Sequence, residues 1–391
     1  MTIDDRTVPT GFFGALGDNG KVMNLGVASG KVVGNTDGTG GVTGHINGKN
    51  VRIINCWNNA SIVSSNNVGG IVGSGNVTEG TVIEKCYNLG TIINNKSGGA
   101  GGIVGRTNLQ NITIRNCYNL GKITSSGGSS GGIQSGANKQ TMPIVENCFN
   151  AGEVGGSVSL RAAICGESNA PIKNCYYDSQ TSLVGGGTAT GLSTEKMKTW
   201  ALSYALNNQS MDGPWKYNAG GYPDFGTLDT PKDWSVIGQG IEDGLIKEGA
   251  LTSGNGSESS KYNIGSAEQL AAFAQKVNAG NPGNTSLGTA ICASLTANID
   301  LTGAKYNGTS SHPIPWIPIG NESNIYKGVF EGNGKIIANM KVEQEGNGGL
   351  FGCAGGGAVI RRLGLDATCS VKTTAPSSAA ASGGTAAFVG I

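Results

Sequence analysis

The sequence predicts an all-β protein made of right-handed parallel β-helix (solenoid) segments with short capping helices. Two short phrases that return at one spacing carry this prediction. The first is a cysteine followed by an aromatic residue, and it begins at Cys56, Cys86, Cys117, Cys148 and Cys175. The second is a pair of small residues followed by an aliphatic one, and it occupies residues 40–44, 69–73, 101–105, 131–133 and 162–166. Self-similarity at a period of about 30 residues indicates a solenoid in which each repeat forms one coil.

The composition limits the classes of protein to which the chain can belong. Its 391 residues include 68 glycines and only 14% charged residues, but the glycines stand at fixed offsets beside valine and isoleucine. They therefore mark turns between short strands, and disorder is not expected. The net charge of +1 and the lack of a lysine or arginine cluster argue against nucleic acid as a partner. No run of apolar residues is long enough to predict a membrane span.

Residues 1–185 are expected to form an array of about six coils of about 30 residues each. Within the third repeat, short β-rich runs at 102–105, 111–114 and 121–124 are broken by glycine, and no helical period separates them. Strands of this kind pair with the coils above and below, so a single coil is not expected to be stable alone.

The five cysteines share one repeat position, and we expect them to form a buried ladder of free thiols. Equivalent residues of neighbouring coils lie about 4.8 Å apart with parallel side chains, whereas a disulfide needs Cβ atoms about 3.8 Å apart and suitably angled. Thiols in such a column act as small hydrophobic groups. The pairs Cys165–Cys175 and Cys353–Cys369 stay open as disulfides. No cysteine or histidine spacing typical of zinc occurs, so no metal site is expected.

Two further columns accompany the cysteines. An asparagine precedes four of them, and we expect its side chain to bond to its own turn and to equivalent amides, at Asn55, Asn116, Asn147 and Asn174. The aromatic residue that follows each cysteine faces inward if the strand runs straight, and outward if the chain bends at the asparagine. An inward column belongs to the core, which we favour. An outward column would offer a stacked platform for sugar rings.

Residues 186–232 are expected to be a cap or linker, with a helix near 194–207 and a loop-like aromatic segment after it. Residues 233–391 are expected to start a second β-helix, opened by a capping helix near 266–278. Such a helix covers the open end of a β-helix, which otherwise presents unpaired backbone groups.

The capping helix has both a start signal and an apolar face. Ser266 and Gln269 stand three residues apart and form a capping box. Leu270, Phe273 and Val277 then follow the helical period, so one face of the helix is apolar.

These phrases resemble the repeats of bacterial surface proteins of the GLUG type, in which Asn-Cys-Tyr-Asn and Gly-Gly-Ile-Val-Gly recur at about this spacing. The second half is similar to the family too, in its segments 266–278, 295–301, 316–320, 327–334 and 349–352. The resemblance covers nearly the whole chain. It implies a secreted or cell-surface, adhesin-like structural protein of a bacterium, a stiff stalk whose loops bind a host glycan or surface protein. It also implies that the first 185 residues correspond to the end of one array and residues 233–391 to the beginning of another.

The chain therefore starts and stops within a repeat. Phe12 and Phe13 hold the position of the second phrase near the N-terminus, and Phe388 and Val389 hold it near the C-terminus. Either the chain is a fragment of a long tandem protein, or its open ends stack between molecules. In the second case these four residues form an end-to-end interface, and the protein is the subunit of an extracellular filament. Residues 1–6 lack the basic and apolar regions of a signal peptide.

Catalytic signals are weak, and we expect a non-enzymatic protein without a cofactor. Repeats of this type also occur upstream of the catalytic domain of IgA-cleaving metallopeptidases. The two histidines of this chain, His45 and His312, do not form the metal-binding pattern HExxH of such a domain. Residues 127–131 match the nucleophile pattern GxSxG, but they stand in a Gly/Ser loop without a strand-to-helix setting.

A carbohydrate-active β-helix enzyme is the remaining alternative. Glycosidases need paired acids in one groove. Here Glu84 and Glu146 fall two coils apart in one column, and Arg115 separates them. We interpret this column as a solvated face on which charges pair between coils.

Overall fold

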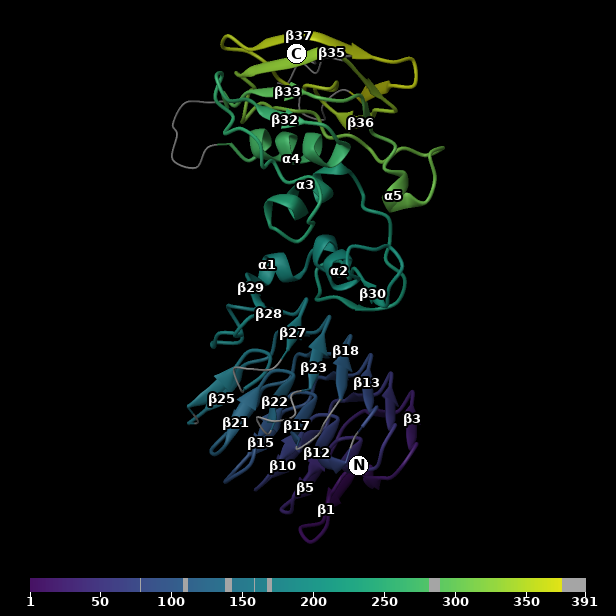
Figure 1. Cartoon of the computed structure of the whole chain (residues 1–391), viewed down its shortest axis with the longest axis vertical. Coiled ribbons are helices and arrows are strands. Elements are labelled where there is room, and N and C mark those ends of the chain that lie inside the picture. The colour runs from purple at the N-terminus through teal and green to yellow at the C-terminus, as the bar shows by residue number, and fades with distance from the viewer. Residues whose placement is uncertain are drawn as a thin grey trace. The chain divides into compact units, whose positions relative to one another are not determined.

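The computed structural model describes residues 1–77, 79–107, 112–137, 143–157, 159–166, 171–280 and 289–374. The chain divides into two compact units. Unit 1 consists of Met1–Thr199 and Leu206–Thr227, and unit 2 consists of Trp200–Ala205 and Leu228–Ile391. In both units stacked parallel strands form a β-solenoid, as Figure 1 shows, so the predicted fold class is confirmed.

Unit 1 stacks its coils through five parallel sheets, named A to E here. Sheet A contains β1 (Thr2–Asp4), β5 (Lys31–Gly34), β10 (Ser61–Ser64), β15 (Ile92–Asn94), β20 (Ile123–Ser125) and β25 (Val154–Gly156). Sheet B contains β6 (Thr39–Gly40), β11 (Val68–Gly69), β16 (Ala100–Gly101), β21 (Ser129–Gly131) and β26 (Leu160–Ala162). Sheet C contains β2 (Phe13–Leu16), β7 (Thr43–Asn47), β12 (Val72–Val77), β17 (Val104–Thr107) and β22 (Gln134–Ala137).

The remaining two sheets carry the cysteine phrase. Sheet D contains β3 (Lys21–Met23), β8 (Arg52–Ile54), β13 (Val82–Glu84), β18 (Thr113–Arg115), β23 (Ile144–Glu146) and β27 (Ile172–Lys173). Sheet E contains β4 (Gly26–Val27), β9 (Trp57–Asn58), β14 (Tyr87–Asn88), β19 (Tyr118–Asn119), β24 (Phe149–Asn150), β28 (Tyr176–Asp178) and β29 (Thr190–Leu192). Each cysteine therefore stands at the corner between sheets D and E.

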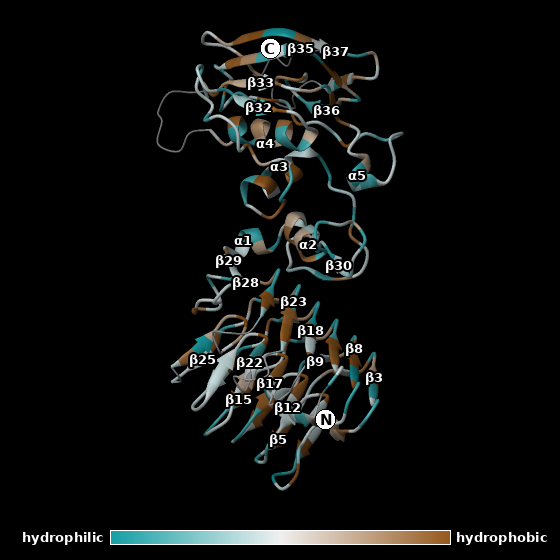
Figure 2. Ribbon diagram, in the orientation of Figure 1, coloured by the Kyte–Doolittle hydropathy of each residue, from teal (hydrophilic) through white to brown (hydrophobic). Residues whose placement is uncertain are grey.

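The strand register explains the repeat period. Ile62 pairs with Ile92 and Tyr87 pairs with Trp57, so equivalent residues of these coils are 30 positions apart. The cysteines of the first phrase and the aliphatic residues of the second phrase are buried in one core, and Figure 2 shows the hydrophobic segments within the stacked strands. This core includes Ile53, Ile83 and Ile114 of sheet D, together with the aliphatic residues of the second phrase, Ile71, Ile103 and Ile133.

The region 194–207, expected as one helix, holds two short ones. Helix α1 (Thr194–Met197) begins at the N-cap Ser193, and α2 (Trp200–Leu206) follows it. The hydroxyl of Thr199 donates to the carbonyl oxygen of Lys196 over 2.9 Å, in the break between the helices. In unit 1 the segment after α2 then forms an antiparallel pair, β30 (Trp215–Lys216) and β31 (Asp224–Phe225).

Unit 2 combines helices with a parallel sheet. Its elements after α2 are α3 (Trp234–Glu242), β32 (Tyr262–Ile264), α4 (Ala267–Asn278), β33 (Ala293–Leu295), β34 (Ile299–Asp300), α5 (Ala304–Asn307), β35 (Val329–Ala338), β36 (Lys341–Glu345), β37 (Val359–Leu365) and β38 (Ser370–Thr374). Strands β32, β33, β35 and β37 pair in that order, β34 also pairs with β35, and β36 pairs with β38. The last coils keep the period of unit 1, because Val329 pairs with Val359, an offset of 30.

Helix α4 occupies the region in which a capping helix is expected. The side chain of Ser266 accepts a hydrogen bond from the backbone N–H of Gln269, and Figure 1 shows α4 alongside β32. Phe273 is fully buried, and its ring lies 6.1 Å from that of Tyr326 and 5.8 Å from that of Phe330. Helix α3 packs on α4 with Gly238 so close that an added Cβ would lie 2.5 Å from the carbonyl oxygen of Ala271. The sequence patterns considered above did not predict α3.

Candidate functional site

The five cysteines of the repeat phrase form one buried column in unit 1. Each thiol donates to the carbonyl oxygen two residues before it, at sulfur-to-oxygen distances of 3.2 to 3.4 Å. The backbone N–H groups of Cys86 and Cys117 donate to the sulfur of the next coil. Burial raises the pKa of the Cys86, Cys117 and Cys148 thiols, so these groups are protonated and unsuited to nucleophilic attack.

All nine cysteines are free in the structure. The two disulfides that the sequence left open, Cys165–Cys175 and Cys353–Cys369, are therefore not formed. Cys165 is buried, and its burial raises the pKa of its thiol to about 12. The chain thus carries a thiol-rich interior without a cross-link.

The asparagines before the cysteines stand at bends of the backbone. Asn55, Asn116, Asn147 and Asn174 have φ angles between 50° and 53°, in the left-handed region that asparagine tolerates better than most residues. The amide of Asn55 bonds to Asn24, and that of Asn174 bonds to Asn147, each over 2.8 Å. Lys85 takes the same conformation in the intervening coil and interrupts the amide column. The bend is therefore common to all these coils, whereas the amide ladder is discontinuous.

A second asparagine ladder, which the sequence patterns did not predict, is continuous. The third residue of the cysteine phrase points into the core, and each amide Nδ2 donates to Oδ1 of the next coil over 2.8 Å, through Asn58, Asn88, Asn119 and Asn150. The ladder ends on the hydroxyl of Ser182, 2.9 Å from Asn150. Each Nδ2 also donates to the backbone carbonyl oxygen two residues on. The signal was in the sequence, because this asparagine recurs with each of the first four cysteines.

The glycines of the second phrase make room for this ladder. A Cβ added to Gly70 would lie 2.1 Å from the carbonyl oxygen of Gly102 and 2.6 Å from the side chain of Asn88. The same clash recurs one coil on, between Gly102 and Asn119. The two phrases therefore recur together because one supplies the buried amide and the other supplies the space beside it.

The aromatic column lies on the outer side of sheet E. Strand β14 holds only Tyr87 and Asn88, and Asn88 points inward, so the ring points to the opposite face. The rings of Tyr87, Tyr118 and Phe149 are stacked almost parallel, with centroids 4.8 and 5.1 Å apart. The inward position that we favoured is wrong, because the left-handed bend at the asparagine turns the chain before the cysteine.

At Tyr118 and Phe149 this outward column does not offer a platform for sugar rings. The faces of the rings are covered by the neighbouring rings of the column, and the hairpin β30–β31 covers their edges. Trp215 lies 5.4 Å from Phe149, and Phe225 lies 5.5 Å from Tyr118, measured between ring centroids. Phe149 is fully buried and Tyr118 exposes 7% of its surface. The column is thus the base of a second apolar layer of unit 1.

The candidate end-to-end interface is described only at its N-terminal part. The backbone N–H of Phe13 donates to the carbonyl oxygen of Val42 over 2.8 Å, so Phe13 holds the position of the second phrase in the first coil. Phe12 and Phe13 expose 48% and 38% of their surfaces. Phe388 and Val389 lie outside the described residues. The structure therefore does not bring the four residues of this candidate together.

The charged column of sheet D contains a pair between coils. Arg115 donates to Glu84 over 2.9 Å, and the register places Glu146 on the other side of Arg115. Glu84 and Glu146, the carboxylates weighed above as a catalytic pair, are thus separated by the guanidinium group of Arg115.

The remaining catalytic and metal-binding candidates also lack the arrangements of side chains that such sites need. His45 is buried with Nδ1 2.7 Å from the hydroxyl of Ser74, and Nδ1 of His312 lies 3.0 Å from Ser311. Ser129 of the GxSxG match lies in strand β21 instead of a strand-to-helix turn. Within the described ranges, no group of three or more His, Cys, Asp or Glu side chains is arranged to hold a metal ion.

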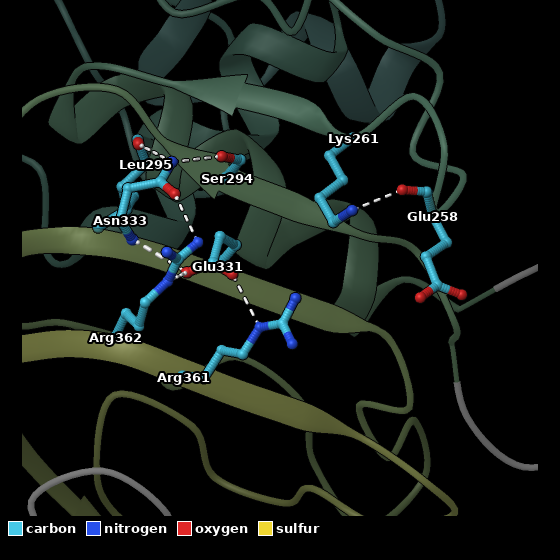
Figure 3. A network of polar contacts seen from close by, with 8 residues as sticks. All are labelled: Glu258, Lys261, Ser294, Leu295, Glu331, Asn333, Arg361 and Arg362. Carbon is cyan, nitrogen blue, oxygen red and sulfur yellow. Dashed lines mark hydrogen bonds and ion pairs between the residues drawn. The ribbon is translucent and has the colours of Figure 1, made fainter.

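Unit 2 contains a compact network of charges on the outer face of its sheet, drawn in Figure 3. Glu331 of β35 exposes 5% of its surface, and its two carboxylate oxygens accept hydrogen bonds from Nε of Arg361 and Nε of Arg362, each over 2.8 Å. The bond from Arg362 is the largest cause that lowers the pKa of Glu331 to about 2, and the N–H of Asn333 and Arg361 act in the same direction. Asn333 continues the network to the hydroxyl of Ser294, 2.8 Å away.

A cavity of about 670 Å³ lies elsewhere in unit 2. Amide side chains line much of the cavity, but most of them form hydrogen bonds with neighbouring residues of unit 2. Asn278 donates to the carbonyl oxygen of Pro318 and accepts from the N–H of Gly320, and Asn324 donates to the carbonyl oxygen of Asn278. The cavity therefore offers fewer free donors than its lining suggests.

Comparisons of the chain with protein-family models, with curated proteins and with solved structures found no match. Among the described residues, none of the helices has the length and apolar character needed to cross a membrane.

Proposed function

We propose that the chain is a non-enzymatic structural and adhesive β-solenoid of a secreted or cell-surface bacterial protein, a stiff stalk that presents binding loops. The observation that carries this proposal is the buried ladder through Asn58, Asn88, Asn119 and Asn150. Its hydrogen bonds are directional and shielded from water, and every member is bonded on both sides, to the next coil and to its own turn. Such a ladder opposes sliding of one coil over the next, which is the property that a stalk needs.

The distribution of polar groups supports the same role. The interior of unit 1 is filled by aliphatic, thiol and amide columns, whereas charged pairs such as Lys49–Glu79 and Lys122–Glu153 join coils on the outside. Loops on the outside therefore tolerate change without loss of the core. The resemblance to GLUG-type repeats supports a place at the bacterial surface and a host glycan or surface protein as the partner.

The test measures two properties of the full chain, its retention on glycans and host proteins and its ability to cleave polysaccharides. The full chain is applied to arrays of immobilised glycans and host surface proteins, and separately incubated with soluble polysaccharides whose reducing ends are counted. We expect retention on the arrays and no new reducing ends, with heat-unfolded chain as the control. New reducing ends would overturn the structural role in favour of a carbohydrate-active enzyme, and no retention on any surface would overturn the adhesive role.

One observation favours a second candidate, the subunit of an extracellular filament. The outer edges of β2 and β3 have no partner strand within the described part of the chain, and exposed apolar side chains gather there, with Phe12, Phe13 and Met23 at 48%, 38% and 53% exposure. The described strands leave the outer edge of β37 unpaired as well. Both edges belong to stacks of parallel strands, so one copy can extend the solenoid of the next by a heterologous contact.

Assembly of the full chain at micromolar concentration tests this candidate. Negative-stain electron microscopy and sedimentation are expected to show filaments that the double variant Phe12→Ser/Phe13→Ser and the double variant Phe388→Ser/Val389→Ser both abolish. Leu183→Ser serves as the control, because Leu183 is an exposed apolar residue at 70% exposure outside these edges. A wild-type chain that stays monomeric, or filaments that persist in the double variants, would exclude it.

A further inference from the structure

Two consecutive arginines of β37 lie on the same face of the sheet. Neighbouring residues of a strand normally point to opposite faces. Arg362 breaks this alternation because its φ angle is 54°, and the pairing of β35 with β37 shifts register at the same place. The left-handed conformation is unfavourable for a residue with a long side chain. An arginine at a position where glycine or asparagine would be less strained points to a use of its side chain.

The carboxylate of Glu331 accepts a hydrogen bond from each arginine through its Nε atom. Arg361 donates through Nε alone among the described residues, and Arg362 donates through Nε and, over 3.3 Å, through one terminal nitrogen to Asn333. The two side chains are 59% and 65% exposed. Figure 3 shows the terminal nitrogens of Arg361 directed away from Glu331. One negative and two positive charges leave a net charge of +1, carried by guanidinium groups that are already oriented.

Neutral polar groups lie in the same row of the sheet as Arg361. The strand register places Asn263, Ser294, Glu331 and Arg361 in one row across β32, β33, β35 and β37. Lys261 directly precedes β32 in the same sheet. The row thus places amide and hydroxyl groups in line with the positive charge of Arg361, which suits a ligand that carries both hydroxyls and anionic groups.

We propose that Arg361 and Arg362 form an anion-binding site for a carboxylated or sulfated polysaccharide. A planar guanidinium donates two parallel hydrogen bonds to a carboxylate or a sulfate, and an arginine already anchored at Nε loses little conformational freedom on binding. This proposal specifies the class of ligand for the adhesive role and therefore rests on the proposed function.

The experiment measures binding of the full chain to three defined probes. The probes are heparin oligosaccharides, oligogalacturonate and neutral dextran, each at low and at moderate salt. We expect both anionic probes to bind and dextran not to bind, with affinity that falls as salt rises. The double variant Arg361→Gln/Arg362→Gln is expected to weaken binding about tenfold or more, because two charge-assisted contacts are lost.

Two further variants separate a binding role from a purely structural one. Lys372→Gln removes an exposed cation from β38 and is expected to change affinity less than about twofold. Glu331→Gln removes the carboxylate that orients both guanidinium groups, so anion binding is expected to weaken even though both positive charges remain. Circular dichroism verifies that each variant is folded. A wild-type preference for heparin alone would assign the site to sulfate groups, and a preference for oligogalacturonate alone would assign it to carboxylates.

The proposal is overturned if the anionic probes bind no better than dextran, or if the folded double variant binds them as tightly as the wild type does. If the chain is retained on neutral glycans and the double variant is retained equally well, the site is rejected but the adhesive function is not. Cleavage of any probe would instead reject the non-enzymatic function itself.

Discussion

Units 1 and 2 both stack parallel strands in coils, but with opposite kinds of interior. In unit 1 one residue type fills each column over several coils, as the amides from Asn58 to Asn150 show. In unit 2 single large rings fill the core, and Tyr326, Phe330 and Phe351 pack at differing angles. Repetition specifies a coil through contacts with its copies, whereas the coils of unit 2 depend on individual fits between unlike side chains. Loss of one side chain therefore has different consequences in the two units.

The largest effect is expected from Phe273→Ala in unit 2. The ring is fully buried between α4 and the sheet, and truncation of such a ring costs about 3–5 kcal/mol of the free energy of unfolding. Hydrogen exchange measured by mass spectrometry should show faster exchange throughout unit 2 and little change in unit 1. Equal acceleration in both units would show that the two interiors are not independent.

Asn119→Leu in unit 1 should cost slightly less, about 2–4 kcal/mol, because it leaves buried groups of Asn88 and Asn150 without their partners. Protection is expected to fall in the coils on both sides of residue 119. Asn59→Leu provides the control, since Asn59 is exposed and, among the described residues, its side-chain amide donates to the carbonyl oxygen of Ala28 alone. A variant at position 119 as stable as this control would remove the argument that the ladder holds the coils together.

Acid should weaken unit 2 through Glu331. The pKa of this carboxyl falls from 4.5 to about 2 on folding, chiefly because of Arg362. A lowered pKa means that the stabilisation is complete above pH 4.5 and is lost as the pH falls toward 2. Urea unfolding between pH 6 and 2 should show this loss, and Glu331→Gln should reduce it for unit 2. An unchanged pH profile in the variant would contradict the assigned pKa.

The smallest effect is expected at Lys85, the one member of the bend column of Cys56 to Cys175 that is not asparagine. Lys85→Asn should stabilise unit 1 by about 0.5–1 kcal/mol, because asparagine adopts the left-handed conformation at lower cost. Thermal melting of the variant beside Lys96→Asn, a substitution outside the column, measures the difference. A lower melting temperature would mean that the lysine side chain contributes more than the bend does.

The sequence predicted what depends on the repeat and missed what depends on local turns. The period, the parallel coils and the cysteine column follow from spacing alone. The direction of Tyr87 and Asn88 does not, because one left-handed residue before the cysteine decides which side chain points inward. Arg361 and Arg362 were missed for the same reason, since a strand pattern places consecutive residues on opposite faces. The cover of the aromatic column by Trp215 was missed because no local pattern links residues so far apart.

The pairing of the buried amides with the glycines beside them has a consequence for how such a chain changes its length. The two stacking surfaces of an inner coil of unit 1 are complementary, because Asn88 and Asn119 each accept a hydrogen bond from the coil on one side and donate one to the coil on the other. Removal of the 31 residues from 88 to 118 would bring equivalent positions of the ladder together and restore its hydrogen bonds, although Glu84 would then stand opposite Glu146 without Arg115 between them. The height of the stack therefore changes in steps of one whole coil, about 4.8 Å each, because only a whole coil keeps every amide of the ladder opposite another amide.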